Sequence, residues 1–230
     1  MLFLFDIDGT LLRRMPPAHR LALCDAAATV FGVQLSTPDL GQTAGMTDSA
    51  ITWRMLRAAG VPDATIAEGL PAFFTVAADA YERHVPNDLR PYHTPHAQPA
   101  LERLAGLGAH LGLVTGNIRR VAWTKLRAAG LADYFIDGGF GDEASEREKL
   151  PPLALARMED ACARTFAPEM VFVVGDTPAD VACGAACGLR TVAVATGPIH
   201  SLAELRDAGA DYAFEDLSGL TTLELENPHP

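Results

Sequence analysis

The sequence predicts an α/β protein: a doubly wound, Rossmann-like parallel sheet with an all-helical segment inserted after the first strand. Short apolar runs alternate with helical patterns from about Thr94 onward. Apolar strands of this kind belong to parallel sheets that helices cover on both faces. Residues 13–91, in contrast, have helical patterns and no convincing strand. We therefore expect a core domain formed by residues 1–12 and 92–230, and a helical cap domain formed by residues 13–91.

The expected strands are short apolar runs, several of which end in polar residues or glycine. Short apolar runs bounded by turn signals are typical of a strand buried on both faces. The runs with this pattern are, in chain order, Leu2–Phe5, His110–Val114, Tyr134–Ile136, Met170–Val174, Thr191–Val194 and Tyr212–Phe214.

The expected helices begin at proline or capping residues, and several end at glycine. In the inserted segment they are Pro16–Phe31, a helix from Thr47 or Asp48 to Gly60, and Ala64–His84. In the core they are Ile118–Ala129, Leu150–Thr165, Pro178–Cys187 and Ser201–Ala208. The last residues, Glu226–Pro230, are expected to be a frayed tail.

Charge and composition exclude several classes of partner. A formal net charge of -11 argues against a nucleic-acid surface, which needs clustered Lys and Arg, but not against a small phosphorylated substrate. No apolar run approaches the roughly 20 residues of a membrane span, and the first residues lack the pattern of a signal peptide. The four cysteines form no C-x-x-C pair, which favours reduced thiols. We expect a cytoplasmic protein without nucleic-acid or membrane partners, either a monomer or a homodimer.

Two carboxylates follow the first expected strand directly. Asp6 and Asp8 lie two residues apart in Asp6-Ile7-Asp8-Gly9-Thr10, so their side chains can point the same way from the strand end. The carboxyl ends of parallel strands are where open α/β sheets place their ligands. Carboxylates held this close repel each other, and a divalent cation would relieve the repulsion. The alternative is that Asp8-Gly9 is an ordinary turn signal.

A second expected strand ends in Thr115-Gly116-Asn117 and opens a helix. A helix N-terminus offers free N–H groups, which suit a phosphate. Thr115 could add a hydroxyl beside the amides of Gly116 and Asn117. The alternative is that Thr115 or Asn117 only caps the helix.

A third expected strand ends in Gly175-Asp176-Thr177-Pro178-Ala179-Asp180. Asp176 would bring another carboxylate to the edge that carries Asp6 and Asp8, and oxygen ligands of this kind are those that Mg²⁺ prefers. A charged residue right behind five apolar ones is unfavourable unless it is used. Asp180 fits the third position of a capping box with Thr177, so capping and metal binding are both open to it.

These three motifs, in this order and at strand ends, resemble those of the haloacid dehalogenase-like hydrolase superfamily. The resemblance covers the whole chain, because the helical insertion looks like the C1 cap of that superfamily, and it is strongest to phosphoglycolate-phosphatase-like members. It implies that Asp6 is the nucleophile, which becomes an aspartyl-phosphate. Asp8 matches the general acid and base, and Thr115 matches the hydroxyl that holds the phosphoryl group.

The resemblance also implies a Mg²⁺ site. Asp6 and Asp176, with the backbone carbonyl of Asp8, match its ligands, and Asp180 is a further candidate. An acid at the position of Asp8 favours phosphoryl transfer, because the dehalogenase branch generally lacks it. The expected activity is thus a Mg²⁺-dependent phosphatase acting on a small phosphomonoester. A sugar-phosphate mutase, a phosphonate hydrolase and a non-catalytic phosphometabolite-binding regulator are the alternatives. A phosphonate hydrolase would want a lysine in the cap, and no lysine precedes Lys125.

One motif departs from the family pattern, which has a Lys, often followed by Pro, before the helix that leads to the fourth strand. Here the candidates are Arg147 and Lys149, and neither has Pro directly behind it. Pro151-Pro152 suggests that the helix begins only at about Leu150, which leaves Arg147 in the loop that reaches the site. The planar guanidinium can also bond a carboxylate and a phosphoryl oxygen at once, so we favour Arg147.

The inserted segment is expected to select the substrate, as lids commonly do. Gly41 to Thr47 is predicted to be a loop near the site. Exposed arginines on a helical segment can equally be only solvated. The residues that could face the substrate are Arg13, Arg14, Thr43, Met46, Thr47 and Arg54.

Overall fold

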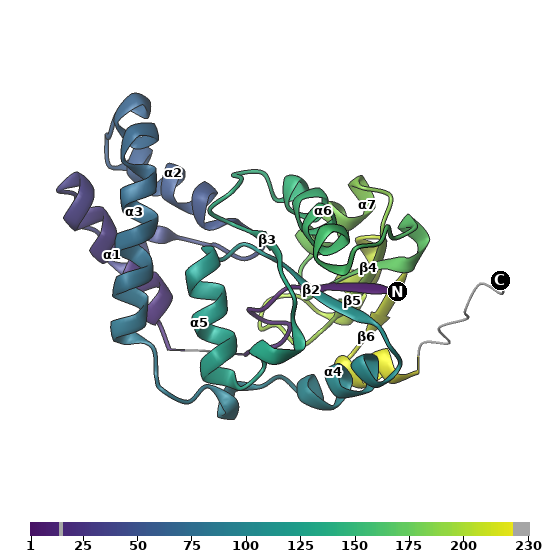
Figure 1. Cartoon of the computed structure of the whole chain (residues 1–230). Coiled ribbons are helices and arrows are strands. Elements are labelled where there is room, and N and C mark those ends of the chain that lie inside the picture. Colours follow the sequence, from purple (N-terminus) through teal and green to yellow (C-terminus); the bar gives the residue numbers. More distant parts are fainter. Residues whose placement is uncertain (14–15, 223–230) are drawn as a thin grey trace.

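The computed structural model describes residues 1–13 and 16–222; Arg14 and the predicted tail Glu226–Pro230 lie outside the described residues. Its centre is a parallel sheet of six strands in the order β3-β2-β1-β4-β5-β6 (Figure 1). The predicted doubly wound, Rossmann-like sheet is confirmed. The strands are β1 (Leu2–Phe5), β2 (His110–Thr115), β3 (Gly138–Phe140), β4 (Val171–Gly175), β5 (Arg190–Val194) and β6 (Tyr212–Phe214).

Helices cover both faces of the sheet, and alternate side chains of the strands contact them. Phe3 and Phe5 of β1 belong to a core with α4 (Ala97–Gly106) and α5 (Arg119–Ala129). The intervening residues of β1 pack against α6 (Leu150–Cys162). Figure 1 shows α6 and α7 on the opposite side of the sheet from α4. The remaining α-helices described in this part of the chain are α7 (Pro178–Ala186) and α8 (Leu202–Asp207).

The sheet places the central strands β1, β2 and β4 side by side with their carboxyl ends at one edge. Leu2 pairs with His110 on one side and with Val171 on the other, so the register is equal across the three strands. The polar motifs behind these strands therefore meet at one edge, as parallel topology requires.

The segment between β1 and α4 is helical, as predicted. It contains α1 (Ala18–Phe31), α2 (Asp48–Ala58) and α3 (Asp63–His84), which share an apolar core to which Ile118, just before α5, and Val121 of α5 also belong. The two ends of this segment lie side by side, because the Arg13 amide donates to the Tyr92 carbonyl at 2.8 Å. The division into a core and a cap at residues 13–91 stays a prediction.

The predicted strand Tyr134–Ile136 is wrong. Tyr134 ends a short 3₁₀ helix, and the edge strand β3 begins four residues later, at Gly138. Glycine is a poor strand former on its own, but here close packing requires it: a Cβ on Gly138 would lie 2.3 Å from the Leu113 carbonyl oxygen. Phe135, which the apolar pattern assigned to a strand, instead packs edge-on against Phe5.

Two further differences concern helices. Helix α4 was not predicted as a separate element. Helix α6 ends at Cys162 rather than at Thr165, because Ala163 has a left-handed backbone conformation with φ of 49°. The other predicted helices agree with the structure to within two residues at each end.

Candidate active site

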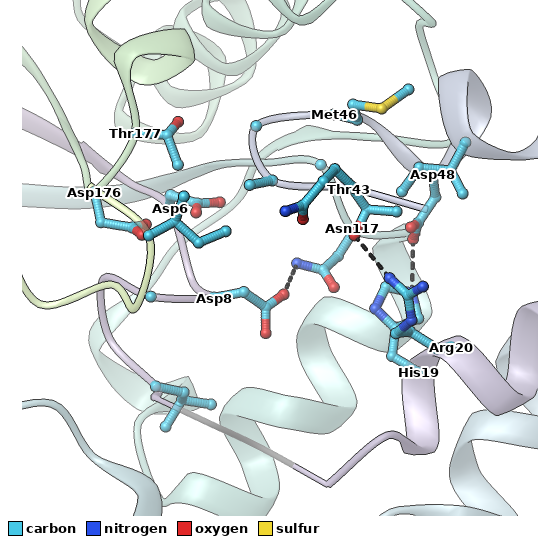
Figure 2. Close-up of a pocket in the computed structure, with 18 of the residues that line it drawn as sticks. Asp6, Asp8, His19, Arg20, Thr43, Met46, Asp48, Asn117, Asp176 and Thr177 are labelled. Atoms are coloured by element: carbon cyan, nitrogen blue, oxygen red, sulfur yellow. Dashed lines mark hydrogen bonds and ion pairs between the residues drawn. The ribbon is translucent and has the colours of Figure 1, made fainter. Parts of the chain in front are cut away.

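A cavity of about 400 Å³ lies between the strand ends and the inserted helices (Figure 2). The core and the inserted segment both contribute polar side chains to its wall. From the core these include Asp6, Asp8, Asn117, Arg147, Asp176 and Thr177, and from the inserted segment His19, Arg20, Thr43 and Asp48.

Three carboxylates lie together beside the cavity, and two of them, Asp6 and Asp176, line it. Asp6, Asp176 and Asp180 each offer an oxygen, and these oxygens lie within 4.8 Å of one another. Figure 2 shows the carboxylates of Asp6 and Asp176 facing each other. Burial and the neighbouring carboxylate of Asp180 raise the pKa of Asp176 to about 8. Burial raises the pKa of Asp6 to about 7, although Arg147 opposes this shift. Such a set is compatible with a hard divalent cation, which would offset the repulsion.

Glycines hold the Asp176 carboxylate closely. A Cβ on Gly197 would lie 1.8 Å from its Oδ2, and a Cβ on Gly9 would lie 2.1 Å from the same atom. Gly9 also has φ of 93°, a conformation that side chains disfavour. Thr10 Oγ1 donates to Asp176 Oδ1 at 3.1 Å. Gly9 and Thr10 of the first motif therefore position the carboxylate of Asp176, which belongs to the third motif.

Asp180 has its oxygens engaged by protein donors. Its Oδ2 accepts from the Thr177 amide at 3.0 Å and from Thr177 Oγ1 at 2.7 Å, which forms the capping box of α7. Its Oδ1 accepts from Arg147 Nη2 at 2.5 Å. Capping therefore accounts for one oxygen of Asp180, and an ion pair accounts for the other.

Arg147 is the cation of this carboxylate group. It is 7% exposed, and its Nη2 lies 3.2 Å from Asp6 Oδ1 in addition to its contact with Asp180. Burial alone would lower its pKa, but the charges of Asp180 and Asp6 outweigh burial and raise it, so it stays protonated. Its buried Nε has no hydrogen-bond partner among the described residues.

Lys149 lies elsewhere. Residues Arg147–Lys149 form a short 3₁₀ helix, in which residues two apart point in different directions. The Lys149 side chain is 65% exposed, and its ammonium pairs with Glu146 at 3.0 Å. The structure therefore brings Arg147 to Asp6 and leaves Lys149 in solvent.

Asp8 has a different environment from Asp6. Its Oδ2 accepts from Lys125 Nζ at 2.6 Å and from Asn117 Nδ2 at 2.8 Å. Partial withdrawal from water would raise its pKa, but the ammonium of Lys125 and the nearby His19 lower it below the ordinary value. The two aspartates of the motif thus have separate cations and opposite pKa shifts.

The second motif forms the floor beside Asp8. Asn117 Nδ2 donates both to Asp8 and to Thr115 Oγ1, at 2.8 and 2.7 Å, and Asn117 Oδ1 accepts from Lys125. Thr115 is fully buried and is absent from the residues that line the cavity. Gly116 does line it, and its Cα is closely covered, since a Cβ there would lie 2.2 Å from the Met46 carbonyl oxygen.

The expected substrate-binding residues of the inserted segment divide into two groups. Thr43 and Met46 line the cavity. Thr47 is buried, where it caps α2 by accepting from the Ala50 amide and donates to the Ser145 carbonyl. Arg54 donates to the Gln42 carbonyl at 2.7 Å and lies outside the cavity. Arg13 is exposed and is likewise outside it.

Four charged or titratable residues of the cavity wall were not singled out from the sequence: Lys125, His19, Asp48 and Arg20. His19 Nε2 lies 2.9 Å from Asp48 Oδ2, and its Nδ1 lies 3.4 Å from Lys125 Nζ (Figure 2 shows the first pair). Asp48 also accepts from the Ile118 amide at 2.7 Å. A signal for Lys125 was available, because it is one of only two lysines in the chain and lies in the helix that follows the second motif.

Comparison with known proteins identifies the family of this chain. The model of the haloacid dehalogenase-like hydrolase family matches residues 1–188. The chain belongs to this family. A phosphoglycolate phosphatase from Cereibacter sphaeroides is 30% identical over 203 residues, which cover 86% of this chain and 88% of that protein.

Solved structures share the fold. A haloacid dehalogenase-like hydrolase from Bacteroides fragilis superposes with a TM-score of 0.68 at 20% identity, covering 95% of this chain and 98% of that one. A β-phosphoglucomutase from Clostridium difficile superposes with a TM-score of 0.69 at 15% identity, covering 98% and 93%.

Family membership and the similarity to curated phosphatases make this chain a phosphatase, an enzyme that hydrolyses phosphoric monoesters. In the described part of the chain, no helix combines the length and apolar character needed to span a membrane.

Proposed function

We propose that the protein is a Mg²⁺-dependent phosphatase that hydrolyses a small phosphomonoester through an aspartyl-phosphate on Asp6. The observation that carries this proposal is the pairing of Asp6 with a second carboxylate, Asp176, and a buried cation, Arg147, at one end of the cavity. A nucleophilic carboxylate needs such surroundings, because a phosphoryl group brings further negative charge to it.

The reaction has two steps. In the first, an Asp6 oxygen attacks the phosphorus, the bond from phosphorus to the alcohol oxygen breaks, and Asp8 gives that oxygen a proton. In the second, Asp8 takes a proton from a water molecule, which attacks the phosphorus and breaks its bond to Asp6. Free phosphate leaves, and Asp8 is protonated for the next cycle. Arg147 stabilises the transferring group through its positive charge, because it lines the cavity and its Nη2 lies 3.2 Å from Asp6 Oδ1.

The residues present fit a Mg²⁺ ion. Asp6 and Asp176 would hold it, with the backbone carbonyl of Asp8 completing the protein ligands, because oxygen donors are those that Mg²⁺ prefers. Asp180 would act mainly through Arg147 and the cap of α7, to which its oxygens are committed. When bound, the ion would neutralise charge on the phosphoryl oxygens.

Mg²⁺ removal gives the first testable result. In excess EDTA, phosphatase activity is expected to fall to background, and added Mg²⁺ should restore it, because Asp6, Asp176 and a phosphoryl group repel one another without a cation. Phosphate release is the measurement, and thermal denaturation with and without Mg²⁺ is the control for folding. Full turnover after exhaustive chelation would contradict the proposed metal role.

The substrate class follows from the curated relatives and from one cation. The relatives are phosphoglycolate phosphatases, whose substrate is a small alkyl phosphate with a carboxylate. Arg20 lines the cavity, and in the described part of the chain its acceptors are neutral oxygens, including the Gly41 carbonyl and Thr43 Oγ1. A guanidinium placed in this way favours a substrate with a second anionic group.

A panel of phosphometabolites tests this assignment. We expect free phosphate from small alkyl phosphomonoesters, with acidic ones such as phosphoglycolate preferred over neutral ones. The products should be analysed as well as the phosphate. An isomerised phosphosugar without phosphate release would replace the phosphatase by a mutase.

We further propose that residues 13–91 act as a cap over this site. The N-terminus of α2 is attached to the core, because the Asp48 amide donates to the Gly116 carbonyl at 2.7 Å and the Ser49 amide to the Gly141 carbonyl at 3.0 Å. The inserted segment thereby closes the cavity from one side, which would exclude water during transfer. The four unpaired cysteines fit a reducing compartment, so we also propose a cytoplasmic location.

A further inference from the structure

Lys125 is a buried lysine at the junction of the core and the inserted segment. It lies on α5, and its side chain is 1% exposed. Asp8 and Asn117 of the core contact its ammonium, while His19 of α1 lies 3.4 Å away and the Tyr81 ring of α3 lies 5.8 Å from it. A lysine is rarely buried so completely without a partner that requires it.

The contacts of Lys125 fix one oxygen of Asp8. Lys125 Nζ and Asn117 Nδ2 both donate to Oδ2, and no hydrogen bond within the described residues reaches Oδ1. Lys125 also donates to Asn117 Oδ1 at 2.6 Å, which sets the direction of the Asn117 amide. One ammonium therefore orients Asp8 directly and through Asn117.

We propose that Lys125 is a positioning residue, which holds Oδ2 of Asp8 so that Oδ1 is presented to the reacting oxygen. The proposal rests on the proposed function, because it assumes that Asp8 transfers the proton. Proton transfer needs a heavy-atom separation of about 2.6–3.2 Å, so a carboxylate free to rotate would lose much of its effect. Lys125 would thus act on the leaving alcohol and on the attacking water through one carboxylate.

Two substrates with different leaving groups distinguish a positioning role of Lys125 from a merely structural one. An alkoxide must be protonated as it leaves, whereas 4-nitrophenolate leaves without help. The first step alone governs kcat/KM, since the alcohol departs in it. A variant that misplaces Asp8 should therefore lower kcat/KM for an alkyl phosphate and spare kcat/KM for 4-nitrophenyl phosphate.

The variant is Lys125→Met, which keeps the length of the side chain and removes the donor. We expect kcat/KM to fall roughly 10- to 100-fold for the best alkyl phosphomonoester of the panel, part of the 10²–10⁴-fold that a general acid contributes. For 4-nitrophenyl phosphate we expect a change within about threefold. Arg127→Met is the matched control, because Arg127 is an exposed cation of the same helix that contacts Thr124, and both values should stay unchanged.

A double-mutant cycle with Asp8→Asn tests whether Lys125 acts through Asp8. In the Asp8→Asn background, Lys125→Met should lower kcat/KM for the alkyl phosphate by less than about threefold, because the carboxylate that Lys125 positions is already gone. If Lys125→Met lowered kcat/KM equally in the wild type and in Asp8→Asn, the proposal would be overturned. A loss of kcat/KM that is the same for both substrates would also overturn it, since that is the mark of general damage to the site.

Two further comparisons complete the test. Asp8→Asn alone must lower kcat/KM for the alkyl phosphate and spare that for 4-nitrophenyl phosphate. If it does not, the proposed role of Asp8 as the proton donor is wrong. This result differs from one in which only Lys125→Met lacks the effect. If Lys125→Met does not fold, Lys125→Gln retains a shorter, uncharged donor. In Lys125→Gln, kcat/KM should again fall more for the alkyl phosphate than for 4-nitrophenyl phosphate, but by less than expected for Lys125→Met. An equal fall in kcat/KM for both substrates would again overturn the proposal.

Discussion

Asp6→Asn is expected to abolish phosphorylation of the enzyme and to lower turnover by on the order of 10⁴-fold or more, as loss of a nucleophile does. The amide has nearly the volume of the carboxylate, so packing around this buried position is preserved. It cannot form the acyl phosphate, and it removes a charge from the ion pair with Arg147. Steady-state phosphate release and acid-quenched mass spectrometry are the measurements.

The control for Asp6→Asn is a measurement of its folding stability. Burial raises the pKa of Asp6 to about 7, so we expect a neutral side chain to cost little stability there in the metal-free protein. Thermal denaturation of the metal-free variant should therefore match or exceed that of the wild type. Turnover near the wild-type rate in a folded Asp6→Asn protein would exclude the covalent mechanism.

Arg147→Ala is expected to raise the barrier to turnover by about 2–4 kcal/mol, the usual cost of removing one aimed donor or cation. It should also destabilise the metal-free fold by about 3–5 kcal/mol, because it leaves Asp6 and Asp180 buried without their cation. Kinetics at saturating Mg²⁺ and urea unfolding measure the two effects separately.

Lys149→Ala is the comparison for Arg147→Ala. Lys149 is exposed and pairs only with Glu146 on the surface, so its loss should change stability by less than about 1 kcal/mol and turnover much less than Arg147→Ala does. The reverse ranking of the two variants in kcat would show that Lys149 moves to the phosphoryl group during catalysis and takes the place that we assign to Arg147.

The sequence was informative where one strong local signal determines the structure. Leu2–Phe5 is apolar and ends at Asp6, so the strand and the position of its carboxylate at the sheet edge follow from alternation and parallel topology. The helix start at Leu150, inferred from the prolines behind it, left Arg147 before the helix, where the structure places it within reach of Asp6.

The rest depends on contacts between distant segments, which local patterns do not encode. Strand β3 begins with two glycines, and only the close approach of neighbouring backbone explains them. Lys125 reaches Asp8 across 117 positions of sequence, and the helical period of α5 indicates only that it faces inward. Thr47 was expected to face the substrate as well as to begin a helix. It does cap α2, but its hydroxyl also donates to the Ser145 carbonyl and it does not line the cavity. These outcomes depend on how segments far apart in the sequence pack against one another.

The central claim is that Asp6 carries the phosphoryl group, and the most direct measurement uses Asp8→Asn with 4-nitrophenyl phosphate. This ester needs no acid to phosphorylate Asp6, while water activation by Asp8 is lost, so the phosphoenzyme should accumulate. We predict a rapid burst of one equivalent of 4-nitrophenol, and peptide mass spectrometry after acid quenching should locate one phosphoryl group on Asp6. Steady turnover without a burst or an adduct, or a phosphoryl group on another residue, would contradict the account.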